Sequence, residues 1–176
     1  MLPSFEIDMP VKNSSIKITY KEAVADATKY FDGDELAATT WLNKYAMKDR
    51  EGNLLETTPD DMHRRMAREF ARIETGYEKK KKQNDSSENL SAYGKMRGFL
   101  SEEKIFQLFS HFKYIIPQGS VMSALGNTNM IASLSNCIVL PELYDSYGGI
   151  FYADQQLAQL FKRRCGVGLD ISTIRP

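Results

Sequence analysis

Apolar side chains recur at helical spacing through the first two thirds of the chain. The spacing predicts a helix over residues 21–31, a second helix that begins after Asp34, and a third that begins at Thr58. Asp34 is a suitable N-cap, and the sequence Thr-Pro-Asp-Asp from Thr58 is typical of a helix start. The third helix is expected to carry arginines opposite an apolar stripe. The stripe consists of Met62, Met66, Phe70, Ile73 and Tyr77.

Polar and apolar positions separate again on both sides of residue 100. The lysine-rich segment 79–91 looks least ordered, and we interpret its lysines as a solvated helix end or loop. Ser101-Glu102-Glu103 begins another helix, which Pro117 and Gly119 end. Its expected buried side chains are Ile105, Leu108, Phe109, Phe112 and Ile116. The pattern therefore predicts an irregular lead-in over residues 1–20 and a helical domain over residues 21–116.

From Val121 the pattern changes to strand, helix, strand. Ile138-Val139-Leu140 is a short apolar run ended by Pro141, which favours a strand buried on both faces. Such a strand would present the thiol of Cys137 from a buried position. The following helix should place five apolar residues on one face: Ile150, Ala153, Leu157, Leu160 and Phe161.

A second strand is predicted around Leu169 to Ile174, parallel to the first and joined to it by a right-handed crossover. Two parallel strands do not close a sheet. We therefore expect residues 117–176 to be the start of a larger α/β domain, incomplete in this chain. Because a crossover helix separates Cys137 from Cys165, we expect the two thiols to stay unpaired.

Composition narrows the functional classes. The 176 residues include 23 Lys plus Arg against 23 Asp plus Glu, which argues against a nucleic-acid binder with a basic surface. No apolar run approaches the ~20 residues of a membrane helix, and two cysteines do not make a disulfide scaffold. We expect a cytoplasmic protein. His63 and His111 lack a second histidine or paired cysteine nearby, so no metal site is predicted.

Several motifs resemble the large, catalytic subunit of ribonucleotide reductase. The strand motifs are Ser135-Asn136-Cys137, Asp145-Ser146, Gly166-Val167-Gly168 and Ile174-Arg175-Pro176, in the order and spacing of that family's first barrel strands. The upstream motifs are the segments 30–38 and 58–65, so the resemblance runs from about Tyr20 onward. It implies a mostly α N-terminal layer that leads into the first strand-helix-strand unit of a ten-stranded α/β barrel.

The resemblance gives Cys137 a role. In the family, the cysteine at this strand position is one of two thiols that reduce the ribose and end as a disulfide. Its mate and the radical cysteine lie far downstream, so we expect these 176 residues to be inactive alone. Without the resemblance, a lone strand thiol is more simply a small buried hydrophobe.

Two further groups of residues follow from the resemblance. Asn136, Cys165 and Gly166 match positions at the substrate-binding edge, as does the segment 123–126, although Cys165 stands where the family has glycine or alanine. By itself that thiol is more simply a small filler. Asp145, Ser146 and Arg175 match the group that holds a deoxynucleoside triphosphate effector. From the residues alone, Asp145 and Ser146 are helix caps and Arg175 is a surface cation.

The implied partners are those of the complete enzyme. They are the remainder of the catalytic subunit, a second copy in a homo-oligomer, a ribonucleotide substrate, dNTP or ATP effectors and a thioredoxin-like reductant. Radical generation implies adenosylcobalamin or a metal-containing subunit, neither bound by this chain. Whether the substrate is a diphosphate or a triphosphate stays open. One alternative is a non-catalytic helical interaction module that binds a partner chain. Another is a small redox protein using Cys137 and Cys165, although the chain has no CxxC motif.

Overall fold

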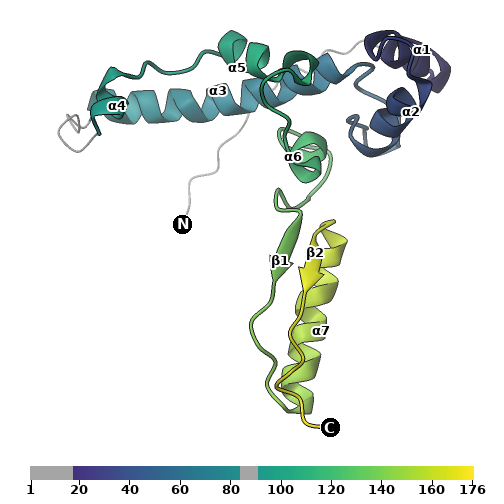
Figure 1. Cartoon of the computed structure of the whole chain (residues 1–176), viewed down its shortest axis with the longest axis vertical. Coiled ribbons are helices and arrows are strands. Elements are labelled where there is room, and N and C mark those ends of the chain that lie inside the picture. The colour runs from purple at the N-terminus through teal and green to yellow at the C-terminus, as the bar shows by residue number, and fades with distance from the viewer. Residues whose placement is uncertain (1–17, 84–90) are drawn as a thin grey trace.

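The computed structural model describes residues 18–83 and 91–176. Almost all of the predicted lead-in, and residues 84–90 of the lysine-rich segment, lie outside these ranges. Figure 1 shows a layer of helices, here called the helical body (residues 18–126), from which a strand-helix-strand unit projects. We call this unit the arm (residues 131–176).

Six α-helices and one 3-10 turn make up the described part of the helical body. They are α1 (Tyr20–Tyr30), α2 (Glu35–Lys44), α3 (Pro59–Gln83), α4 (Ala92–Met96), α5 (Glu102–Phe109), η2 (Ser110–Phe112) and α6 (Gly119–Ala124). Asp34 caps α2 as predicted, its Oδ1 accepting the Ala37 N–H at 2.8 Å. At the start of α3, one carboxylate oxygen of Asp61 accepts the backbone N–H groups of Thr57 and Thr58.

The core of the body lies where α1, α2, α3, α5 and α6 meet. Its buried apolar members are Ala23, Ala27, Ala38, Trp41, Leu42, Leu54, Met62, Met66, Ala67, Ile105, Phe109, Met122 and Leu125. The predicted stripe of α3 is therefore buried only in its first half, because Phe70, Ile73 and Tyr77 are exposed. Arg65, expected on the opposite face with the other arginines, is buried.

The helix predicted to run from Ser101 to Ile116 is shorter than expected. α5 ends at Phe109, and the backbone turns left-handed at His111 (φ 54°) and Phe112 (φ 53°). Two consecutive residues in this region cannot continue a right-handed helix. Ile116 is consequently 71% exposed rather than buried. The pattern change at Val121 was also interpreted wrongly, since this residue lies within α6, whose Met122 joins the core.

In the arm, β1 (Cys137–Val139), α7 (Tyr147–Lys162) and β2 (Gly166–Gly168) form the predicted parallel crossover. The register pairs Cys137 with Gly166 and Val139 with Gly168. The second strand therefore ends before the predicted Leu169–Ile174 segment. In that segment the Asp170 carboxylate accepts the Ser172 N–H at 2.8 Å, a local turn that competes with strand pairing.

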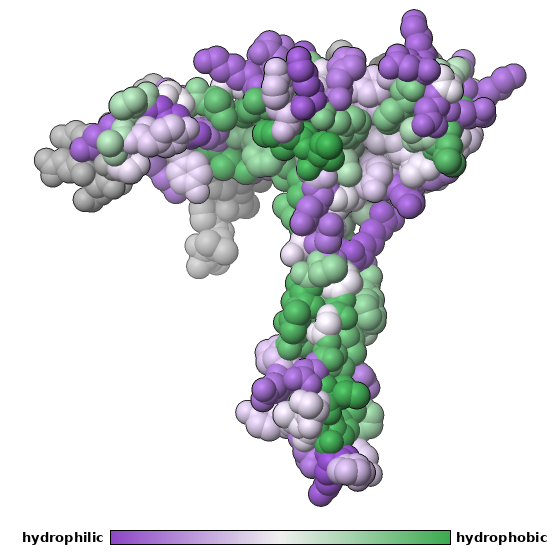
Figure 2. All heavy atoms as spheres, in the orientation of Figure 1, coloured by the Kyte–Doolittle hydropathy of each residue, from purple (hydrophilic) through white to green (hydrophobic). Residues whose placement is uncertain are grey.

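The sheet is open and has two strands within the described residues. β1 is therefore not buried on both faces: the Cys137 side chain is exposed, and Val139 is 78% exposed. Leu140, Ala153 and Cys165 are the buried residues of the arm. Figure 2 shows apolar residues along much of the arm's surface. The exposed large side chains of the arm include Val139, Phe151, Phe161 and Ile171, together with the aromatic rings of Tyr144, Tyr147 and Tyr152.

No helix in the described ranges is both long enough and apolar enough to cross a membrane.

Candidate functional site

The four residues predicted for catalysis and substrate binding lie together where the two strands begin. Cys137 begins β1, Gly166 begins β2, and the two are paired in register. The Gly166 N–H donates to the carbonyl oxygen of Asn136 at 2.7 Å, and Cys165 directly precedes Gly166. Residues separated by almost thirty positions in the chain thus share one end of the strand pair.

The two thiols lie on opposite faces of the strands. A Cβ placed on Gly166 would lie 3.2 Å from the Cys137 Sγ, so both residues point to the same face. Because side chains alternate along a strand, Cys165 points to the other face, where it is only 3% exposed. Its thiol lies 3.3 Å from the Gly166 carbonyl oxygen. Both cysteines are free, as predicted, and Cys137 is exposed whereas Cys165 is buried.

Asn136 connects the arm to the helical body. Its Oδ1 accepts the N–H of Ser120 at 2.9 Å, in the first turn of α6. The N-cap residue of α6, Gln118, provides no side-chain hydrogen bond, so Asn136 supplies the acceptor that this helix start requires. The side-chain oxygen is thereby committed to the helix. Within the described part of the chain the Asn136 amide nitrogen makes no hydrogen bond, so this nitrogen is the part of the side chain free to meet a ligand.

The residues predicted for effector binding form a second group at the other end of α7. Asp145 Oδ2 and Arg175 Nε are 3.3 Å apart, although thirty residues separate them in the chain. Ser146 is the N-cap of α7, and its hydroxyl accepts the Gly149 N–H at 3.1 Å. The 16 residues of α7 make a helix roughly 24 Å long, so the structure does not join this group to the Cys137 group.

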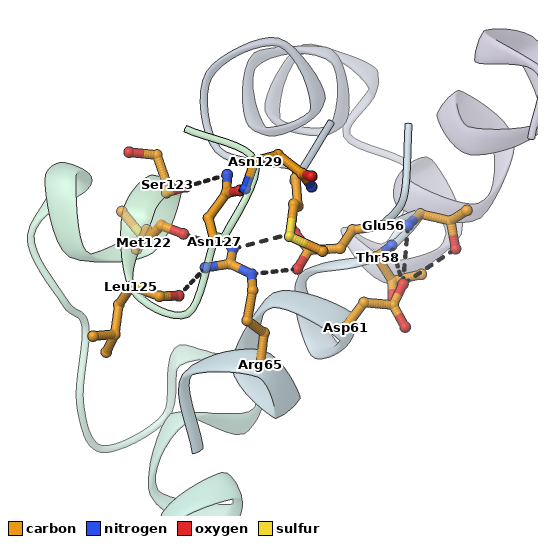
Figure 3. Close-up of polar contacts among 11 residues, drawn as sticks. Glu56, Thr58, Asp61, Arg65, Met122, Ser123, Leu125, Asn127 and Asn129 are labelled. Atoms are coloured by element: carbon orange, nitrogen blue, oxygen red, sulfur yellow. Dashed lines mark hydrogen bonds and ion pairs between the residues drawn. The ribbon is translucent and has the colours of Figure 1, made fainter. Parts of the chain in front are cut away.

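A buried ion pair, missed by the sequence interpretation, links α3 to the loop before it and to α6 within the helical body (Figure 3). Arg65 Nε lies 2.6 Å from Glu56 Oε1, and the two side chains are 8% and 4% exposed. The same guanidinium donates to the carbonyl oxygens of Met122, at 2.8 Å, and Leu125. Glu56 in turn accepts the Met47 N–H at 2.8 Å. Arg65 therefore fixes α6 and the loop before α3. Its position between Met62 and Met66 was the sequence signal for its burial.

A second polar cluster surrounds His63, which is fully buried. The Asp60 Oδ1 lies 3.3 Å from His63 Nδ1 and accepts the Tyr30 hydroxyl at 3.1 Å. Burial lowers the pKa of His63 although Asp60 opposes this effect, whereas burial and the charge of Asp60 raise the pKa of Tyr30. The rings of Phe109 and Phe112 pack against the imidazole. Within the described residues, no group of histidine, cysteine, aspartate and glutamate could hold a metal ion.

Comparison with known families identifies the class of protein. The ribonucleotide reductase all-alpha domain matches residues 31–129, more than half of the chain. The chain therefore belongs to this family, and the matched part corresponds to the N-terminal portion of the large subunit, as the motifs predicted. No individual curated protein and no solved structure matches the chain. Cys137 and the rest of the arm lie beyond the matched residues.

Proposed function

We propose that these 176 residues form the N-terminal region of a ribonucleotide reductase catalytic subunit, in which the arm begins the α/β barrel. The observation that supports this most directly is the exposed Cys137 thiol on a parallel strand pair. This strand pair follows the all-α domain in the chain. An open parallel pair needs further strands at its edges. The remainder of the catalytic subunit is the partner that would supply them.

In this proposal Cys137 is one of two reducing thiols. Two thiols give up two electrons and two protons as their disulfide forms, the ribose carbon exchanges its hydroxyl for hydrogen, and the oxygen leaves as water. Cys165 does not serve as the second thiol, because it is buried on the opposite face of the strands. The second thiol and the radical cysteine must then come from residues outside these 176. A thioredoxin-like protein would reduce the disulfide again.

Asn136, Cys165 and Gly166 would contact the ribonucleotide next to that thiol. The absent side chain of Gly166 leaves room beside the Cys137 Sγ. The free amide nitrogen of Asn136 would donate to the ligand, while Cys165 contributes through its backbone. The described residues contain no metal-binding group, so no step of radical generation is assigned to them. That chemistry, supplied by adenosylcobalamin or a metal-containing subunit, belongs to the completed enzyme.

Asp145, Ser146 and Arg175 would hold a dNTP or ATP effector at the far end of α7, close to a second subunit. Arg175 is largely exposed, so its guanidinium can exchange Asp145 for phosphate oxygens in a bidentate contact. The released carboxylate then accepts a hydrogen bond from a ribose hydroxyl group. Measuring dATP, dGTP and dTTP binding to R175Q in the completed subunit tests this group. Unchanged binding would exclude Arg175 from the effector site.

The central experiment uses the purified 176-residue chain alone and mixed with a chain that supplies the remaining barrel. We expect no reduction of ribonucleoside diphosphates or triphosphates by the chain alone, and turnover by the mixture with the radical source present. The C137S variant should still assemble with the completing chain but give no turnover. Reduction by the chain alone, or normal turnover by the C137S mixture, would refute the role given to Cys137.

The apolar surface of the arm also favours a second function, a non-catalytic module that binds a partner chain. The two functions differ in one outcome. A completing chain that covers the arm but never yields turnover with any radical source would favour the module.

A further inference from the structure

A polar pocket of about 170 Å³ lies among the end of α2, the turn that follows it, the segment after α6, and the entry to β2. Ser123, from the segment 123–126 matched to the substrate-binding edge, lines it, whereas Cys137, Asn136, Cys165, Gly166 and the predicted effector-binding residues do not. Its polar lining includes Asn43, Lys44, Lys48, Asn127, Asn129 and Arg164. The pocket therefore combines residues of the helical body with one residue of the arm.

The cations of this pocket are not neutralised within the described chain. Lys44, Lys48 and Arg164 form no ion pair with a described carboxylate. The acidic residue of the lining is Asp49, whose oxygens already accept the N–H of Glu51 at 3.0 Å and both nitrogens of Asn53 at 2.7 Å. The lining thus has three positive charges and one carboxylate, and that carboxylate already accepts hydrogen bonds within its own turn. Like charges gathered in this way favour a bound anion.

Two of the three asparagine side chains in the lining have an NH₂ group without an acceptor in the described chain. The Oδ1 of Asn127 accepts the Asn129 N–H at 2.9 Å, and the Oδ1 of Asn43 accepts the Tyr20 hydroxyl at 3.4 Å. The Asn127 NH₂ group donates to the Ser123 carbonyl oxygen at 3.4 Å, whereas the NH₂ groups of Asn43 and Asn129 donate to no group within the described chain. A ligand that only accepts hydrogen bonds suits such a lining.

A neighbouring pocket shows what a balanced set of charges looks like. It is lined by Arg65, Arg68 and Arg72, and each of these cations has its own carboxylate. Arg65 pairs with Glu56 and Arg72 with Glu69, both at 2.6 Å, and Arg68 lies 4.0 Å from Glu102. The unmatched cations are therefore a property of the first pocket and not of every basic surface in the body.

We propose that the pocket among Lys44, Lys48 and Arg164 binds a phosphate group. A phosphate dianion offers only acceptor oxygens, which match two ammonium groups, a guanidinium and amide NH₂ groups. The volume exceeds several times the ~30 Å³ that one water molecule occupies in the liquid, so a tetrahedral oxyanion fits. This inference rests on the pocket alone and does not depend on the proposed reductase function.

The test titrates the 176-residue chain with inorganic phosphate at constant ionic strength, following backbone amide shifts by NMR. We expect saturable shifts at residues 44, 48 and 164. K48Q and R164N should each weaken binding about two- to five-fold, the range for one exposed charge contact. Arg164 has φ 63°, and asparagine tolerates this left-handed backbone, so R164N removes the charge without adding strain.

Matched controls separate a site from general attraction. K104Q, at an exposed position of α5, and R68Q in the neighbouring pocket remove the same charge and should leave the affinity unchanged. If R164N does not fold, the K44Q/K48Q double variant decides, since both changes lie on the body's surface. Absence of saturable shifts, or equal weakening by K104Q and K48Q, overturns the proposal.

Three further ligands identify the source of the phosphate. Tighter binding of ADP than of inorganic phosphate, with no binding of adenosine, supports a nucleotide phosphate at this pocket. Equal affinity for ADP and inorganic phosphate supports a site for the phosphate group alone. Binding of adenosine without a phosphate contradicts the proposal. None of these measurements involves Cys137 or turnover, so their failure and the failure of the reductase function are distinguishable.

Discussion

Gly166 lies directly opposite Cys137, and a Cβ at Gly166 would come within 3.2 Å of the Cys137 Sγ. That separation is tighter than ordinary van der Waals contact, so the thiol would have to move. The absence of a side chain at Gly166 is thus part of what keeps the thiol accessible.

G166A should therefore slow the alkylation of Cys137 by iodoacetamide several-fold, because the new methyl group crowds the sulfur. Mass spectrometry of timed samples measures the rate, with Cys165 remaining unlabelled until the chain is denatured. G168A is the control, since its Cβ meets Val139 at an ordinary 3.5 Å. Equal rates in G166A and the wild type would show that Gly166 does not control access to the thiol.

The Arg65–Glu56 pair should contribute strongly to the stability of the helical body. E56Q and R65M each leave a buried charge without its partner, so each should lower the free energy of unfolding by about 3–5 kcal/mol. The double variant should lose much less than the sum, although the Met122 and Leu125 carbonyl groups remain without their donor. Urea unfolding measures all three. Additive losses would mean that the two side chains act independently.

His63 should make the protein less stable in mild acid. Burial lowers its pKa in the folded state, so the unfolded chain binds the proton first as the pH falls below about 6.5. Stability is therefore full above that value and decreases below it, until the folded imidazole is also protonated. H63Q should reduce this loss between pH 7 and pH 5, whereas H111Q should retain it because the buried imidazole is unchanged. Identical pH profiles for H63Q and the wild type would exclude His63 as the cause.

Gly148 and Gly149 are neighbours with opposite tolerance for a side chain. A Cβ on Gly149 would clash with the Tyr144 carbonyl oxygen, whereas one on Gly148 meets only the Ser146 Oγ at 4.0 Å. G149A should destabilise the start of α7 by about 1–3 kcal/mol. G148A should be neutral or stabilise the helix by up to about 1 kcal/mol. Amide hydrogen exchange in α7 measures both, and equal protection in the two variants would contradict this packing.

Local signals in the sequence predicted much of the secondary structure. Asp34 and Ser146 are N-caps because short polar side chains satisfy the first N–H groups of a helix, an interaction within one turn. The early end of α5 could not be predicted in this way. Apolar spacing continues to Ile116, while the left-handed backbone at His111 and Phe112 depends on contacts with α1, such as the His111 N–H donating to Tyr30.

The candidate site also has features that the sequence predicted and features that it did not. The resemblance identified Asn136, Cys137 and Gly166, and the strand register brings them together. The burial expected for Cys137 failed because burial of a strand depends on neighbours that a short apolar run does not contain. The hydrogen bond between the Ser120 N–H and the Asn136 side chain joins residues sixteen positions apart, and no local pattern in the sequence predicts it.

The buried cluster of apolar side chains ends at Leu125, and the buried residues of the arm do not belong to it. We therefore expect the first half of α3 and helix α5 to open only when the whole body unfolds, and the strand pair to open by itself at a smaller free energy. During synthesis the body can fold before other residues cover the apolar surface of the arm. Two tiers of cooperativity follow, and the exposed thiol of Cys137 lies in the less stable one.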